Sequence, residues 1–146
     1  MKLGFVSAIL QQSTFEEVID FAADNGFSCV EMMCWPKGNA ERRYAGVTHI
    51  DVDTLNEEKI KHIQDYCKKK GVEISSLGYY PNTLDPDPKQ RAFFIEHIKK
   101  LIKASNALGI GTVTTFIGRV PTKTVEENLV EFKTVWEPII KLAEQY

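Results

Sequence analysis

The chain has 146 residues, which is enough for one domain with a buried core. Hydrophobic residues make up 43% of the sequence and charged residues 26%, as in ordinary soluble globular proteins. The formal net charge is -2 with acids and bases interspersed, so composition gives no reason to expect nucleic acid or an anionic membrane as a partner.

The three cysteines, Cys29, Cys34 and Cys67, are odd in number and irregularly spaced. Such cysteines are typical of reduced thiols and predict a cytoplasmic protein. Residues 2–10 briefly resemble a signal peptide, but their single basic residue favours a first strand instead. No segment approaches the roughly 20 apolar residues of a membrane helix.

Strand and helix patterns alternate four times along the chain. Strands are predicted at about residues 2–8, 29–33, 73–78 and 112–117, each followed by an amphipathic helix. Gly26, Gly71 and Gly109 are predicted to end the first three helices, since glycine adopts the left-handed conformation at little cost. The alternation predicts an α/β fold with a parallel sheet.

The predicted helix starts carry capping residues. Ser13 with Glu16, Thr54 with Glu57 and Thr124 with Glu127 fit the capping box, in which two side chains satisfy free amides. The third helix is predicted to begin at Asp87-Pro88, an N-cap followed by a favoured first residue. Pro138 lies inside the fourth helix pattern, where it removes one amide bond to Thr134 and is expected to kink or locally loosen the helix.

Four βα units form either a small open α/β domain or the first half of an eight-unit barrel. We predict a single partial domain over residues 1–146. Parallel α/β proteins bind ligands at the carboxyl ends of their strands, so the loops that follow each strand are the candidate site. The side chains there that carry chemistry are Glu31, Trp35, Arg42, Arg43, His49, Tyr79, Tyr80, Asn82 and Arg119.

These loops combine aromatic rings with amides and cations, which suits a sugar or polyol. Aromatic faces would stack on the sugar ring, while Asn82, His49 and Arg119 would bond its hydroxyls or a phosphate. Arg42 is a second candidate for holding a phosphate. The alternative is that the aromatic side chains simply shield the ends of the sheet.

Other chemistries fit poorly. Gly109-Ile110-Gly111 precedes a strand instead of following one, so it is not a nucleotide-binding loop. Ser7, His49 and Asp51 could be imagined as a triad, but the chain has no nucleophile elbow. His62 and His97 fall in the middle of predicted helices, where solvated or packing roles are expected.

The sequence resembles the xylose isomerase-like superfamily of TIM barrels, which contains sugar phosphate isomerases and epimerases. The resemblance rests on residues 1–5 leading into 15–22, on 26–31 followed by Cys34-Trp35-Pro36, on 45–51, and on 104–109. It covers the whole chain and implies that the fold is the first half of a TIM (β/α)8 barrel.

The resemblance also implies site residues and a cofactor. Glu31 matches an acidic residue at the end of strand two, and His49 matches a histidine placed over the site. We predict substrate binding by Glu31, Trp35, His49, Tyr80, Asn82 and Arg119. A divalent metal (Mn, Mg, Co or Zn) and a carboxylate base are implied on strands five to eight, which this chain lacks, so no metal ligand is assigned within it.

These expectations leave three functions open. The first is a sugar or sugar-phosphate isomerase or epimerase that works by metal-assisted proton transfer next to a carbonyl. The second is a non-catalytic sugar-binding or assembly module, and the third is a polyol dehydratase or lyase on the same scaffold. DNA repair is disfavoured, because Tyr79 to Asn82 and Phe116 to Arg119 offer no histidines where the endonuclease branch places them.

A half barrel has two unpaired edge strands and one uncovered apolar face. Strand four lacks a charge over residues 112–117 and has strong β propensity. We therefore expect either a homo-oligomer, with a second copy completing a pseudo-barrel, or a longer protein that supplies the C-terminal half.

Overall fold

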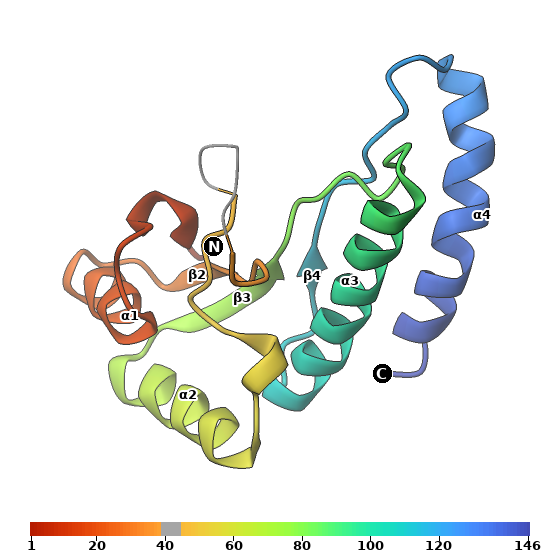
Figure 1. Cartoon of the computed structure of the whole chain (residues 1–146). Helices are drawn as coiled ribbons and strands as arrows, with labels where there is room; N and C mark the ends of the chain where they lie inside the picture. Colours follow the sequence, from red (N-terminus) through yellow and green to blue (C-terminus); the bar gives the residue numbers. More distant parts are fainter. Residues whose placement is uncertain (39–44) are drawn as a thin grey trace.

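The computed structural model describes residues 1–38 and 45–146, and its sheet has four parallel strands in the order β1-β2-β3-β4. The elements are, in chain order, β1 (Gly4–Val6), the 3-10 helix η1 (Ser7–Leu10), α1 (Phe15–Asp24), β2 (Cys29–Met33), the 3-10 helix η2 (Val52–Thr54), α2 (Glu57–Lys70), β3 (Glu73–Gly78), α3 (Pro88–Leu108), β4 (Val113–Thr114) and α4 (Val125–Ala143). The helices lie in a row along the curved sheet, with α1 near one end and α4 at the other (Figure 1). The predicted parallel α/β fold is confirmed.

The core lies between the sheet and this row of helices. Val30 and Met32 of β2 and Leu77 of β3 are completely buried, and they belong to one cluster with Val18 of α1 and Leu101 of α3. Because side chains alternate along a strand, the residues between them face away from the helices. That second face carries Glu31 and Ser76, which form the candidate site.

Two of the predicted helix starts are wrong by one or two residues. The N-cap of α1 is Thr14, whose hydroxyl accepts the Glu17 amide, and not Ser13. The N-cap of α2 is Asn56, because residues 52–54 form η2 before the helix begins. The predicted starts at Asp87 and Thr124 are confirmed.

The outer strands are shorter than predicted. Residues 2–8 and 112–117 were expected to be strands, but β1 spans three residues and β4 two. The inner strands have their predicted bounds. An inner strand is fixed by neighbours on both sides, whereas β1 and β4 pair on one side only within the described residues.

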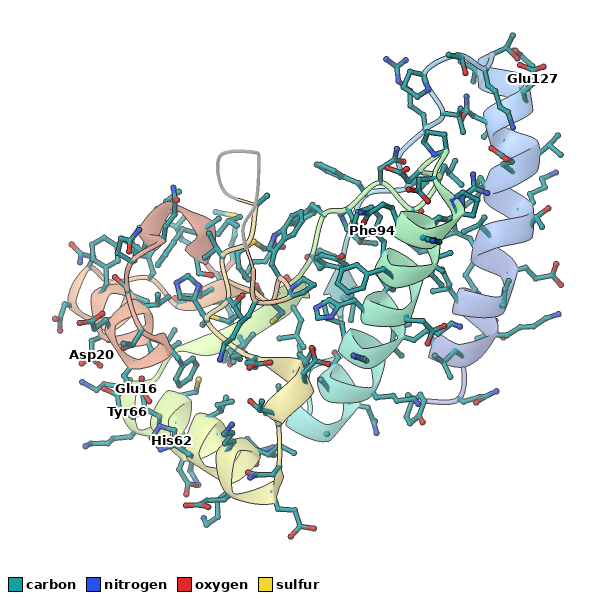
Figure 2. The ribbon with its side chains drawn as sticks, viewed as in Figure 1. Glu16, Asp20, His62, Tyr66, Phe94 and Glu127 are labelled. Atoms are coloured by element: carbon teal, nitrogen blue, oxygen red, sulfur yellow. The ribbon has the colours of Figure 1, made fainter. Side chains whose placement is uncertain are left out.

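The helices contact one another through polar pairs as well as through the core. His62 Nε2 of α2 lies 2.7 Å from Glu16 Oε1 of α1, and the Tyr66 hydroxyl donates to Asp20 Oδ1 at 2.8 Å. Figure 2 shows these four side chains together between α1 and α2.

His97 of α3 is buried, with Nε2 2.8 Å from the Cys34 carbonyl oxygen. Both histidines thus have the structural roles that were expected.

The helix α4 runs without interruption through Pro138. The α2 and α3 helices end at Gly71 and Gly109, both in the left-handed conformation, as predicted. Across the described parts of the chain, the structure contains no helix with the length and apolar character needed to cross a membrane.

Candidate functional site

The centre of the candidate site is the Glu31 carboxylate, on the sheet face away from the helices. Ser76 Oγ of β3 and Thr114 Oγ1 of β4 each donate to Glu31 Oε2 at 2.9 Å. The Tyr80 hydroxyl, just after β3, donates to Oε1. Two hydroxyl groups from neighbouring strands and one from the loop after β3 therefore fix this carboxylate at the carboxyl-terminal edge of the sheet.

Gly78 lies directly against the side chains of Met33 and Glu31. A Cβ there would lie 2.0 Å from Met33 Cε and 3.0 Å from Glu31 Oε1. Gly78 thus leaves room for the Glu31 side chain to lie against β3. A carboxylate has about four lone-pair positions, and the three hydroxyls use one on Oε1 and two on Oε2. Counting donors from the described residues, one acceptor position on Oε1 remains for another donor.

Tyr80 forms the aromatic wall of the site together with Phe116. Their ring centroids are 4.7 Å apart. Phe116 follows β4 in the chain, and its side chain is more than half exposed. Burial, with the hydrogen bond to Glu31 as a second cause, raises the pKa of Tyr80 to about 12. Tyr80 therefore stays protonated at neutral pH and remains a donor to Glu31. A groove of about 560 Å³ beside β4 is lined by Tyr80 and Thr114.

His49 is bonded on both ring nitrogens within the chain. Nε2 lies 3.1 Å from the Leu10 carbonyl oxygen, which can only accept, so Nε2 carries the proton. Nδ1 then accepts from the Ser7 hydroxyl at 2.9 Å. Burial lowers the pKa of His49 below its ordinary value, which keeps the ring neutral. The structure thus places His49 beside the β1 loop, where it holds η1 against the segment that follows residue 44.

The same contacts argue against Ser7 as a nucleophile. Ser7 is fully buried, and its Oγ accepts the Met33 amide at 2.9 Å. Asp51 bonds Lys37 and its own helix start instead of His49. A Ser–His contact is present, but the serine is inaccessible and the third member of the triad is elsewhere.

Trp35 and Tyr79 pack edge to face, with ring centroids 4.9 Å apart. Tyr79 is completely buried and also packs on His97, so it belongs to the helix-side core and not to the open face. Trp35 contacts both the main core and a small cluster of Ala8, Met33 and Val47. Of the aromatic side chains named from the sequence, Tyr80 alone is bonded to Glu31.

Asn82 joins the loop after β3 to the loop after β4. Its Oδ1 accepts the Arg119 amide at 2.9 Å, and its Nδ2 donates to the Arg119 carbonyl oxygen at 2.9 Å. A Cβ at Gly118, which has φ +77°, would lie 1.9 Å from Asn82 Oδ1. The amide of Asn82 is thus used for loop structure, whereas the Arg119 side chain lies at the exposed surface of the same junction.

The remaining arginine candidates, Arg42 and Arg43, lie outside the described residues. Within residues 1–38 and 45–146, no three His, Cys, Asp or Glu side chains are grouped so that they could hold a metal ion. Glu31 is the acidic group at the site, and hydroxyl donors already occupy both of its oxygens. The described residues therefore do not fit a metal centre of their own.

Sequence reasoning named Glu31 and Tyr80 but missed Ser76, Thr114 and Phe116. Thr114 pairs in register with Gly78, and Glu31 pairs with Ser76. Alternation along strands predicted from the sequence would have placed Thr114 and Phe116 on one face. It would not have placed Glu31 opposite Ser76, because an irregularity between Val30 and Glu31 shifts the register.

The fold and the site together define half of a parallel barrel with polar residues at its carboxyl end. The sequence profile of the xylose isomerase-like TIM barrel family matches residues 19–146, and the chain belongs to this family. A curated relative, the uncharacterized protein YfiH of Bacillus subtilis (strain 168), is 24% identical over 97% of the chain. The chain spans 44% of the length of that relative.

Solved structures agree on the half barrel. The probable 3-DHS dehydratase AsbF of Bacillus anthracis has a TM-score of 0.71 at 18% identity, with 99% of this chain and 49% of AsbF covered. A D-psicose 3-epimerase of Clostridium cellulolyticum H10, solved with D-tagatose, has a TM-score of 0.68 at 17% identity. The match covers 99% of this chain and 49% of the epimerase chain. The IolI protein, solved with a bound zinc atom, has a TM-score of 0.60 at 18% identity. The match covers 94% of this chain and 48% of the IolI chain. The predicted fold, four βα units that match the first half of a TIM barrel, is confirmed.

Proposed function

We propose that this chain is the substrate-positioning half of a sugar or sugar-phosphate isomerase or epimerase. The observation that carries the proposal is the Glu31 carboxylate, fixed by hydroxyls from three positions and beside an aromatic pair at the carboxyl ends of the strands. This edge is where barrel enzymes bind their substrates. An aromatic face with an oriented carboxylate suits the apolar face and the hydroxyls of a sugar.

In this proposal the open acceptor position of Glu31 Oε1 takes a hydrogen bond from a substrate hydroxyl. Tyr80 and Phe116 contact the carbon skeleton, and Trp35 closes the wall on the side of β2. Arg119 contacts an outer hydroxyl, or a phosphate if the substrate carries one. His49 and Asn82 act on the substrate indirectly, because their polar atoms hold the loops in place.

The proposed reaction removes a proton from a carbon next to a carbonyl. Return of the proton to the neighbouring carbon gives an isomer, and return to the opposite face of the same carbon gives an epimer. The family resemblance implies a divalent metal and a carboxylate base for this chemistry. Neither is assigned to residues of this chain, which hold and orient the substrate. The likeness of the fold to a solved D-psicose 3-epimerase supports the scaffold for such a reaction.

Two other functions remain as proposals on the same site. A half barrel that binds sugar without turnover would be an assembly or binding module. A dehydratase would start from the same proton removal and end with loss of water, and the fold likeness to AsbF supports the scaffold for that outcome too.

Calorimetry of the purified chain with free and phosphorylated ketoses tests the site. We expect Thr114→Val to weaken binding about tenfold, because it removes a donor that fixes Glu31. Thr115→Val is the matched control: Thr115 Oγ1 lies 3.4 Å from the Phe116 carbonyl oxygen, and Thr115 is not a donor to Glu31. Equal loss of affinity in both variants, or in neither, would contradict the assignment of Glu31.

Turnover separates the three functions. Ketose–aldose and ketose–ketose interconversion should be assayed with Mn²⁺ or Mg²⁺ and again after chelation. Conversion that disappears on chelation supports the isomerase or epimerase, while conversion that survives it contradicts the metal-dependent reaction. Metal-independent binding without conversion favours the module, and release of a dehydrated product favours the dehydratase.

A further inference from the structure

Side-chain bonds take over from backbone bonds where β3 and β4 end. Among the described residues, the last backbone bond between these two strand segments runs from the Tyr79 amide to the Thr114 carbonyl oxygen, at 3.0 Å. Beyond it, the side chains of residues 82–83 in the β3 loop bond the backbone of residues 117–119 in the β4 loop. The position of the β4 loop relative to the β3 loop therefore depends on these side chains.

Thr83 is the completely buried member of this junction. Its Oγ1 donates to the Ile117 carbonyl oxygen at 2.6 Å and accepts from Trp136 Nε1 of α4 at 3.0 Å. The direction of both bonds is fixed, because a carbonyl oxygen can only accept and an indole N–H can only donate. A single hydroxyl thus joins α4, the β3 loop and the segment that follows β4.

The α4 end of this connection is held by packing. Trp136 is half-buried against the main core cluster, and its ring centroid lies 6.0 Å from that of Phe132. The bond from Trp136 therefore ties Thr83 to the helix layer. Loss of the hydroxyl would leave both the indole N–H and the Ile117 carbonyl oxygen without their partner in a part-buried place.

The junction adjoins the two rings that form the aromatic wall of the site. Tyr80 precedes Thr83 in the β3 loop, and Phe116 directly precedes Ile117. Tyr80 is held by its hydrogen bond to Glu31. Phe116 has no polar side-chain atom that could be held in this way, so its position follows from the backbone that carries it. Thr83 bonds that backbone one residue further on.

We propose that Thr83 is a positioning residue of the site, which keeps Phe116 against Tyr80 so that the two rings form one wall for the apolar face of a sugar. Thr83 is buried and does not touch the substrate; it acts through the Ile117 backbone. The inference rests on the proposed function, in which this wall contacts the carbon skeleton of the substrate.

A role in positioning has a different signature from a role in stability alone. The apolar face of the sugar contacts the wall in the bound substrate and in the transition state alike. Loosening Phe116 should therefore raise the Kd and the KM while leaving kcat nearly unchanged. A purely structural role would lower the folded fraction and leave the constants of the folded protein unchanged.

Calorimetry and amide hydrogen exchange of Thr83→Val and Thr83→Ser test the inference. Valine has nearly the shape of threonine but neither donates nor accepts, whereas serine keeps the hydroxyl. The probes are D-fructose and D-tagatose, each free and phosphorylated. We expect Thr83→Val to weaken the binding of the sugar that the wild type binds best by about fivefold and to speed exchange in residues 116–119. Thr83→Ser should restore both to within about twofold of the wild type.

Ser105→Ala is the matched control for the loss of a buried hydroxyl. Ser105 is buried, and its Oγ donates to the Ile110 carbonyl oxygen, ahead of β4 and away from the carboxyl-terminal edge. The substitution should lower stability without changing sugar affinity. Trp136→Phe is a milder second variant, because it removes the indole N–H and keeps an aromatic ring. It should act in the direction of Thr83→Val with a smaller effect.

Each contrary outcome identifies what has failed. Unchanged exchange of residues 116–119 in Thr83→Val and in Trp136→Phe would overturn the inference whatever the sugars do. Faster exchange with wild-type sugar affinity would also overturn it, while the proposed function would stand. Equal losses of affinity in Thr83→Val and Ser105→Ala would show general destabilisation instead of positioning. A wild-type protein that binds none of these sugars would overturn the proposed function, and the inference with it.

Discussion

Two polar side chains at the candidate site have all their hydrogen-bonding atoms engaged by the chain itself. His49 joins η1 to the segment after residue 44, and Asn82 joins two loops through the backbone of Arg119. Side chains of these types are often assigned to ligands when they lie near a strand end. Here their contacts within the chain hold the loops that surround Glu31.

The state of His49 predicts a dependence of stability on pH. Because burial lowers its pKa in the folded chain, the unfolded chain binds a proton more readily, near its ordinary value of about 6.5. The contribution of His49 to the free energy of unfolding is therefore complete above about pH 6.5, and it is lost as the pH falls toward the lower pKa of the folded chain. We expect the free energy of unfolding, measured with urea, to decrease from pH 7.5 to pH 5.

His97 contributes in the same direction, since burial lowers its pKa as well. His49→Gln should therefore flatten the dependence only in part, leaving the share due to His97. An unchanged pH dependence in His49→Gln would show that the ring is not held neutral by the fold.

Asn82→Ala should lower the free energy of unfolding by about 1–3 kcal/mol. The substitution removes two bonds to Arg119 and one to the Leu84 amide, which leaves loop backbone groups without partners. Asn106→Ala on the exposed surface of α3 is the control and should change stability by less than about 0.5 kcal/mol. Equal effects in urea titrations of the two variants would rule out the proposed loop junction.

At the scale of elements, α4 contains the clearest local conflict. Pro138 lies within the helix, lacks an amide proton and cannot bond the carbonyl oxygen four residues before it. Pro138→Ala restores that bond, and we expect a gain in stability of about 1–3 kcal/mol in thermal or urea unfolding. Lys133→Ala, at an exposed position of the same helix, should stay close to the wild-type value. A loss of stability in Pro138→Ala would show that the packing of α4 depends on the proline.

Elements whose signals are local could be predicted well from the sequence. The inner strands have their predicted bounds, and the helix starts at Asp87 and Thr124 are as expected. The α1 start was misplaced because Ser13 and Thr14 are both good caps, each with a glutamate three residues later. Choosing between them depends on how Phe15 and Val18 pack, which is a tertiary contact.

The site could be predicted only in part, for the same reason. Glu31 and Tyr80 follow from their positions at strand ends, but the hydroxyl donors Ser76 and Thr114 depend on the register between strands. The irregularity after Val30 changes that register, and its position is not marked by a glycine or proline. Asn82 looked like a ligand-binding amide because its partner, the Arg119 backbone, is distant in sequence.

The strand order β1-β2-β3-β4 follows the chain order, so each unit contacts chiefly the units before and after it. Such contacts are short in sequence, which favours rapid folding, as in repeat proteins. Within residues 1–38 and 45–146, β2 and β3 each pair with a strand on both sides, whereas β1 and β4 each pair on one side. Amide hydrogen exchange should accordingly be slowest in β2 and β3 and faster in β1 and β4. Opening would then proceed from either end, unit by unit, in a chain that looks like a single domain.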